Sequence, residues 1–188
     1  MGRFEETHII PRIRNYTLMY IRYIDDLFMI WKGLEHELLR FLKEINEVHP
    51  TIKFEYKYSR EKVEFLDTVV SISGKKLKTT LYTKPTDRKA YLHRKSYHPK
   101  STKESIAYSQ ATRLRRICTE KEEFEKHAEK LLVDLTNRGY RKEKVLEGIN
   151  RAGNRDRKSL LSYKEKPPND QTPLIVTYHR NLPNLRKS

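Results

Sequence analysis

The sequence predicts an α+β protein in which short strands come first and helices follow. Up to about residue 85, apolar and aromatic residues occur in short runs separated by turns. From about residue 101, apolar residues recur at the spacing of amphipathic helices. The chain has 188 residues, of which 36% are hydrophobic, so it can form one domain or two small ones.

The run LMYIRYIDDLFMIW predicts a hairpin with strands at 18–24 and 27–31 on either side of a tight turn. A helix is expected at 34–47, because an apolar stripe at helical spacing begins at Leu34 and continues through Leu38, Phe41, Leu42 and Ile45. The first part of the chain therefore combines a hairpin with one amphipathic helix.

A second group of strands is predicted after this helix. The stretch TIKFEYKY at 51–58 alternates apolar and charged residues, which is typical of a half-buried strand. A hairpin with strands at 65–72 and 76–82 is expected next, and its turn at 73–75 contains Gly74.

Three helices are expected at 102–118, 120–137 and 141–152. The residues that the first helix should bury are Ile106, Gln110, Leu114 and Ile117. The second helix should end at NRGY, where Gly139 suits the left-handed C′ position. A helix, a glycine turn and a helix outline a helix-turn-helix, and equally any small helical bundle.

Polar and proline-rich residues after 153 predict a linker with one short strand at 173–178. We therefore expect a strand-rich region at 1–85, a helical region at 86–153, and a linker and connector at 154–188.

Two adjacent carboxylates, Asp25 and Asp26, lie between the strands of the first hairpin. Adjacent acids usually lie in solvated turns or at helix N-termini. Here apolar strand residues flank the pair, so a tight turn would present both carboxylates at the hairpin tip. Such oxygens suit Mg²⁺, and two-metal phosphoryl transfer uses carboxylates that flank the ions. Both aspartates are candidate catalytic residues and metal ligands.

The net charge of +15 points to a polyanionic partner, with nucleic acid as the first candidate and a merely soluble basic protein as the alternative. Three groups of cations are candidate sites of nucleic-acid binding, and each could instead be a solvated basic face. The first is a loop where tyrosines suited to base stacking accompany six cations: Lys84, Arg88, Lys89, Arg94, Lys95 and Lys100, with Tyr82, Tyr91 and Tyr97. The second is the helical set Arg113, Arg115 and Arg116. The third lies at the glycine turn and comprises Arg138, Arg141, Lys142 and Lys144.

The single cysteine, Cys118, can form no internal disulfide, which indicates a reducing compartment. No signal peptide follows Met1, and no apolar run approaches the roughly 20 residues of a membrane helix. We expect an intracellular protein without a membrane partner, with the nucleus among the locations that a nucleic-acid partner allows. The pattern does not specify an oligomeric state.

The segment YIDD after a hydrophobic strand resembles the catalytic hairpin, motif C, of reverse transcriptases. The rest of the chain resembles the Penelope-like retroelement reverse transcriptases of animals. The segments that carry this resemblance, in order, are MGRFEE, RYIDDLFMIW, HPTIKFEY, FLDTVV, LYTKPTDRKAYLHRKSYHPKS, RLRRIC and RGY. The resemblance extends over essentially the whole chain.

This resemblance implies the later part of a polymerase palm, then a helical thumb with the helix-turn-helix-like segment of animal copies. Asp25 and Asp26 would bind Mg²⁺, and Tyr23 would contact nucleic acid. The implied partners are an RNA template and a DNA primer, and the implied activity is RNA-directed DNA polymerisation.

The chain also departs from the family pattern. Such a palm needs a further metal-binding aspartate in motif A and a substrate-gripping motif B, and neither precedes Asp25. The chain resembles a fragment truncated at both ends, and we expect it to be inactive alone. The alternatives are a nucleic-acid-binding helix-turn-helix module without catalysis and a decayed genomic copy.

Overall fold

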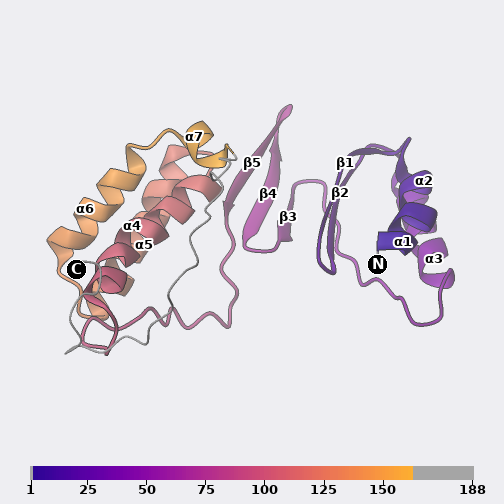
Figure 1. Cartoon of the computed structure of the whole chain (residues 1–188). Helices are drawn as coiled ribbons and strands as arrows, with labels where there is room; N and C mark the ends of the chain where they lie inside the picture. The colour runs from indigo at the N-terminus through magenta and orange to yellow at the C-terminus, as the bar shows by residue number, and fades with distance from the viewer. Residues whose placement is uncertain (1, 163–188) are drawn as a thin grey trace, which may run out of the picture. The chain divides into compact units, whose positions relative to one another are not determined.

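The structure is a computed structural model that describes residues 2–162. The chain separates into two compact units, Met1–Leu66 and Asp67–Ser188. Helices and small antiparallel sheets form the described part, which confirms the α+β class (Figure 1).

Three consecutive helical segments open the first unit, in a stretch for which the sequence pattern predicted no element. They are α1 (Gly2–Phe4), the π-helical η1 (Glu5–Ile9) and α2 (Ile10–Ile13). A π-helical turn inside a helix changes which side chains face the core. Ile9 and Ile13 point into the core as a result, and Glu5 is buried as well.

The predicted first hairpin is confirmed. Strands β1 (Thr17–Tyr23) and β2 (Asp26–Trp31) pair antiparallel, with Tyr23 opposite Asp26. The turn between them consists of Ile24 and Asp25.

The predicted helix after this hairpin is also confirmed, as α3 (Glu35–Glu47). The Glu37 carboxylate accepts a hydrogen bond from the Leu34 backbone N–H at 2.8 Å, which stabilises the first turn of the helix. The apolar stripe of α3 closes the core of the first unit with Leu38, Phe41, Leu42 and Ile45, packed with Ile9 and Ile13.

The strand predicted at 51–58 is wrong, because these residues form no ladder. The Asn46 side chain of α3 instead satisfies the backbone of Phe54. Its amide donates to the Phe54 carbonyl at 3.0 Å, and its oxygen accepts from the Phe54 N–H at 2.6 Å. Alternation of residue types predicted an extended segment, but a strand also requires a partner strand.

The second predicted hairpin is confirmed, with its turn at the expected place. Its first strand begins three residues later than predicted. Strand β4 (Thr68–Ser73) pairs antiparallel with β5 (Lys76–Leu81), and Gly74 in the turn has a φ of +61°. Residues 66–67 form an additional turn after β3 (Lys62–Phe65), in a region that the pattern presented as one continuous strand.

Three predicted helices are confirmed in the second unit. They are α4 (Lys100–Ile117), α5 (Lys121–Asn137) and α6 (Lys142–Gly153), and each packs against the other two (Figure 1). A further short helix, α7 (Arg157–Leu161), interrupts the predicted linker and begins at the capping side chain of Asp156. The strand predicted at 173–178 lies outside the described residues.

The buried face of α4 differs from the predicted one. It consists of Ala107, Ala111, Leu114 and the adjoining Cys118, whereas Ile106, Gln110 and Ile117 are only partly buried. Small residues at this face let α6 approach closely: a Cβ atom added at Gly148 would lie 2.9 Å from the Tyr108 backbone nitrogen. The core that results continues into α5 and α6 through Phe124, Leu131, Leu135, Val145 and Ile149.

No helix among residues 2–162 is long and apolar enough to cross a membrane.

Candidate nucleic-acid interface

The hairpin in the first unit presents both predicted aspartates to solvent. Asp25 lies in the turn, Asp26 begins β2, and both side chains are exposed. Ile24 has a φ of +56°, a left-handed conformation that is strained for a β-branched residue. The Arg22 guanidinium donates a hydrogen bond to the Ile24 carbonyl at 3.1 Å and so contacts the turn directly.

A partly buried ion pair holds this arginine in place. Arg22 Nε lies 2.5 Å from Glu5 Oε2, and Glu5 is only 8% exposed. Burial and the neighbouring Glu5 carboxylate raise the pKa of Tyr20 well above its ordinary value. Sequence reasoning gave Glu5 no role. No periodic pattern marks a residue in a π-helical turn, so only a buried charge in the structure reveals it.

The carboxylate pair does not by itself fit a magnesium centre. Within residues 2–162, no three His, Cys, Asp or Glu side chains converge as a metal site. Two-metal phosphoryl transfer depends on carboxylates that bridge or flank both ions. Asp25 and Asp26 supply one exposed corner of such a site.

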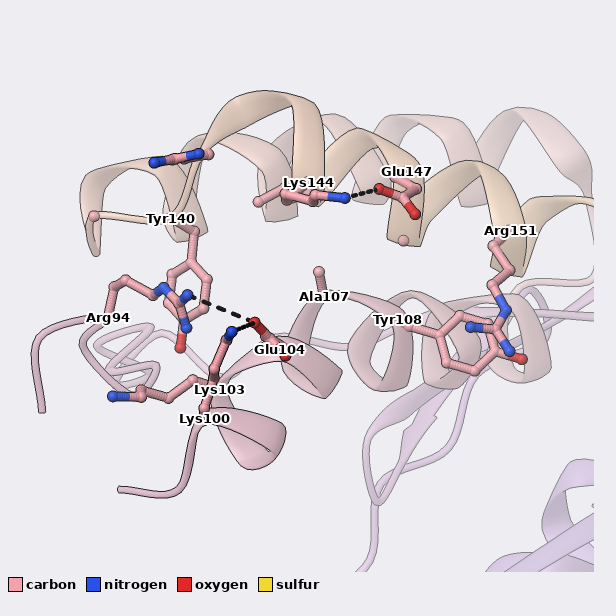
Figure 2. A pocket seen from close by; sticks show the side chains of 14 residues that line it. Arg94, Lys100, Lys103, Glu104, Ala107, Tyr108, Tyr140, Lys144, Glu147 and Arg151 are labelled. Atoms are coloured by element: carbon pink, nitrogen blue, oxygen red, sulfur yellow. Dashed lines mark hydrogen bonds and ion pairs between the residues drawn. The ribbon is translucent and has the colours of Figure 1, made fainter. Parts of the chain in front are cut away.

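A basic groove lies between α4 and α6 in the second unit (Figure 2). Its volume is about 740 Å³. Glu104 and Glu147 are its acidic residues. The cations that line it are Arg94, Lys100, Lys103, Arg141, Lys144 and Arg151. Cations outnumber acids by six to two, so the groove favours an anionic ligand.

The glycine turn between α5 and α6 builds one end of this groove. Gly139 has a φ of +83°, and its N–H donates to the Thr136 carbonyl at 2.9 Å. The Tyr140 N–H donates to the Leu135 carbonyl at 3.1 Å, which completes a Schellman motif. This confirms the predicted role of Gly139, and it directs Tyr140 into the buried cluster.

The loop before α4 brings Arg94 to the same end. The Arg94 N–H donates to the Arg138 carbonyl at 3.0 Å, and its guanidinium lies 6.0 Å from the centre of the Tyr140 ring. At the other end of the groove, the Arg151 guanidinium lies 4.3 Å from the Tyr108 ring centre. Both are cation–π distances, so the two tyrosines hold their arginines at the groove wall.

The predicted nucleic-acid-binding residues are not all brought together. Arg141 lines the groove, and Lys142 is exposed at the first turn of α6. Arg138 takes part through its backbone carbonyl, which accepts the hydrogen bond from the Arg94 N–H. Arg113 forms an ion pair with Asp67 at 2.5 Å, which engages part of its charge.

Other predicted binding residues lie outside the groove. Arg115 and Arg116 occupy the last turn of α4, and Lys84 and Arg88 are exposed in the loop after β5. Tyr23, in the first unit, is 56% exposed beside the aspartate turn. Sequence reasoning missed Lys103, Tyr108, Tyr140 and Arg151. Lys103 and Tyr108 lie on α4, Tyr140 follows α5 and Arg151 lies on α6, so only the packing of α4 against α6 brings these residues together.

Comparison with known proteins adds one finding. A family model described as the animal helix-turn-helix domain matches residues 90–150. This stretch contains α4, α5, the glycine turn and most of α6. No curated protein matches the chain, and no solved structure matches it.

Proposed function

We propose that the helical unit is a nucleic-acid-binding module whose binding surface is the basic groove and the adjoining start of α6. The match to the animal helix-turn-helix domain and the six groove cations support this proposal together. The groove is the observation that carries it, because it gathers cations from α4, α6 and the preceding loop on one concave surface.

Phosphate neutralisation would supply most of the affinity. Lysine and arginine side chains displace counterions condensed on the duplex, so binding should weaken steeply as salt concentration rises. In helix-turn-helix proteins the second helix of the motif enters the major groove with its N-terminal residues near the bases. In this chain Lys142 and Lys144, at the start of α6, would take that position, and Lys144 would exchange its ion pair with Glu147 for the nucleic acid.

The test is fluorescence anisotropy with a labelled DNA duplex across a series of salt concentrations. Replacing both Arg141 and Lys142 by alanine should weaken binding and reduce the slope of log K against log salt by about 1.8, or about 0.9 for each phosphate that is no longer neutralised. The matched control replaces Lys121 and Lys130 of α5, which do not line the groove. Equal reductions in affinity for both double variants would contradict a localised interface.

A second candidate function follows from the hairpin. The exposed carboxylate pair, beside a strained Ile24, and the resemblance to Penelope-like reverse transcriptases favour a role in RNA-directed DNA polymerisation. Asp25 and Asp26 would hold Mg²⁺ together with a further carboxylate. An RNA template paired to a DNA primer would then lie along the helical unit.

Two measurements test the second candidate. Mn²⁺ should broaden the backbone amide signals of Asp25 and Asp26 in NMR spectra, and the double asparagine variant should abolish this effect. The Asp87→Asn variant, in another exposed turn, serves as the control. We expect no Mg²⁺-dependent primer extension by this chain alone, because the described residues provide no third ligand. Broadening that persists in the double variant would contradict the metal assignment.

A further inference from the structure

The Tyr140 hydroxyl is a buried polar group at the edge of the basic groove. Tyr140 is 8% exposed, and its hydroxyl has no hydrogen-bond partner among the described residues. Leaving such a group unpaired costs free energy, so native structures rarely retain one without a reason. Because the residue also lines the groove, a ligand there could supply the missing partner.

Cations from two segments of the chain line this end of the groove together with Tyr140. Arg94 reaches over the Tyr140 ring from the preceding loop, and Lys100 and Lys103 come from the first turn of α4, where Lys103 Nζ also donates to the Ser96 carbonyl at 3.0 Å. Figure 2 shows these side chains gathered at one end of the groove, away from Arg151. No side chain of the described residues caps the N-terminus of α4, whose free N–H groups add positive potential.

One carboxylate currently neutralises part of this charge. Glu104 Oε1 lies 3.9 Å from an Arg94 nitrogen and 3.8 Å from Lys100 Nζ (Figure 2). Both separations exceed the 2.7–2.9 Å of a strong charge-assisted hydrogen bond. Arg94 and Lys100 therefore retain donors for a second anion.

We propose that Tyr140, Arg94, Lys100 and Lys103 form a phosphate-binding site, which a backbone phosphate of the bound nucleic acid occupies. The assignment of the nucleic-acid source rests on the proposed function. The phosphate group fits because it offers several anionic oxygens at once: one accepts the tyrosine O–H, and others meet the guanidinium and the ammonium groups.

The Tyr140→Phe variant separates this role from a structural one. It removes only the hydroxyl, so the free protein should be as stable as the parent or more stable, because the variant has no unpaired buried group at this position. Affinity for the DNA duplex should fall by about tenfold, the effect of removing a hydrogen bond to a charged group. Tyr16→Phe is the matched control. That tyrosine is partly buried in the first unit, where it stacks on Trp31, and it does not line the groove, so DNA affinity should be unchanged.

Glu104→Gln provides a test in the opposite direction. Removing the competing carboxylate should strengthen DNA binding severalfold, because Arg94 and Lys100 then face the phosphate alone. If DNA affinity is unchanged in Tyr140→Phe, or falls in Glu104→Gln, the site assignment is wrong.

Inorganic phosphate distinguishes the site from the proposed function. In the parent protein, titration should shift the backbone amide signals of Arg94, Lys100 and Tyr140, and the shifts should be much smaller in Tyr140→Phe. These shifts without any DNA binding would support the phosphate site and overturn its nucleic-acid source. DNA binding with no phosphate shifts, or competition by polyglutamate as strong as that by DNA, would overturn the phosphate site.

Discussion

Three polar side chains meet where β5 packs against α5. The Thr80 hydroxyl donates to Glu123 Oε2 at 2.8 Å and lies 3.2 Å from His127 Nε2. Burial lowers the pKa of His127 below its ordinary value, and the nearby Lys126 and Lys130 act in the same direction, although Glu123 opposes them. The Thr80 hydroxyl, in turn, lowers the pKa of Glu123. Folding therefore favours a neutral histidine at this position.

This histidine should make stability depend on pH in mildly acid solution. The unfolded chain binds the proton more tightly than the folded one, so stability rises with pH in the window between the two pKa values. The contribution is complete above the unfolded pKa, about 6.5, and is lost as pH falls towards the lower folded value. Urea unfolding between pH 5 and 7.5 should show a slope of at most about 1.4 kcal/mol per pH unit from this group.

The matching variant is His127→Gln, which keeps a polar side chain without a proton equilibrium in this range. Its slope between pH 5 and 7 should be flatter than that of the parent. His36→Gln, on the exposed face of α3, is the control and should leave the slope unchanged. A parent protein whose stability does not change across this range would contradict the assignment.

Close packing of α4 and α6 defines the groove at the scale of elements. A methyl group at Gly148 would lie 2.9 Å from the Tyr108 backbone nitrogen and 3.0 Å from Ala107 Cβ. Neither neighbour is the end of a flexible side chain, so the helices would have to separate. The two walls of the groove would then move apart.

Gly148→Ala should therefore destabilise the second unit despite the better helix propensity of alanine. We expect a net decrease in stability of about 1–2 kcal/mol, as overpacking costs about 1–3 kcal/mol and propensity returns up to about 1 kcal/mol. Asn150→Ala, two residues along on the exposed face of α6, should be neutral or slightly stabilising. Thermal unfolding of both variants checks this, and an equal or higher melting temperature for Gly148→Ala would contradict close packing.

The local sequence pattern predicted most helices and strands. It failed where contacts between residues distant in the sequence determine the structure. The first hairpin, α3 and the three long helices each carry their own periodic signal, so their existence could be predicted. At 51–58 the alternation was present, but no partner strand was, and Asn46 took over the backbone hydrogen bonds. The turn at Leu66, with a φ of +55°, lacks the glycine or asparagine that usually marks such a turn.

The candidate sites follow the same division. Asp25, Asp26 and Gly139 stand out in the sequence because a tight turn requires them or exposes them. Tyr140 and Arg151 do not, since the groove exists only after α4 and α6 have packed. On α4, Leu114 was predicted correctly, but Ala107 and Ala111 were missed because alanines carry a weaker hydrophobic signal than isoleucines, although their small size lets α6 approach.

At the scale of the whole molecule, the two compact units have separate hydrophobic cores. Ile9, Ile13 and the α3 stripe form the first, and the second consists of residues between Ala107 and Ala152. The predicted division at residues 85 and 153 stays a prediction about domains. The position of the cores nevertheless places the entire basic groove within the second unit.

A chain of residues 67–188 should therefore fold and bind DNA without the first unit. Each core is complete within its unit, so deleting residues 1–66 removes no member of the second core. We expect a cooperative thermal transition by circular dichroism. The DNA affinity should lie within about threefold of that of the full chain, and the salt slope within about one unit, because the same cations remain to neutralise phosphates.

The full chain carrying Asp25→Asn and Asp26→Asn is the companion measurement. Removing two negative charges from the first unit should strengthen DNA binding slightly in the absence of Mg²⁺ if that unit approaches the nucleic acid, and not at all if it stays away. A 67–188 chain that folds but binds DNA more than tenfold more weakly would mean that the first unit also touches the nucleic acid. The carboxylate hairpin and the groove would then act on one nucleic acid together, as the polymerase hypothesis requires.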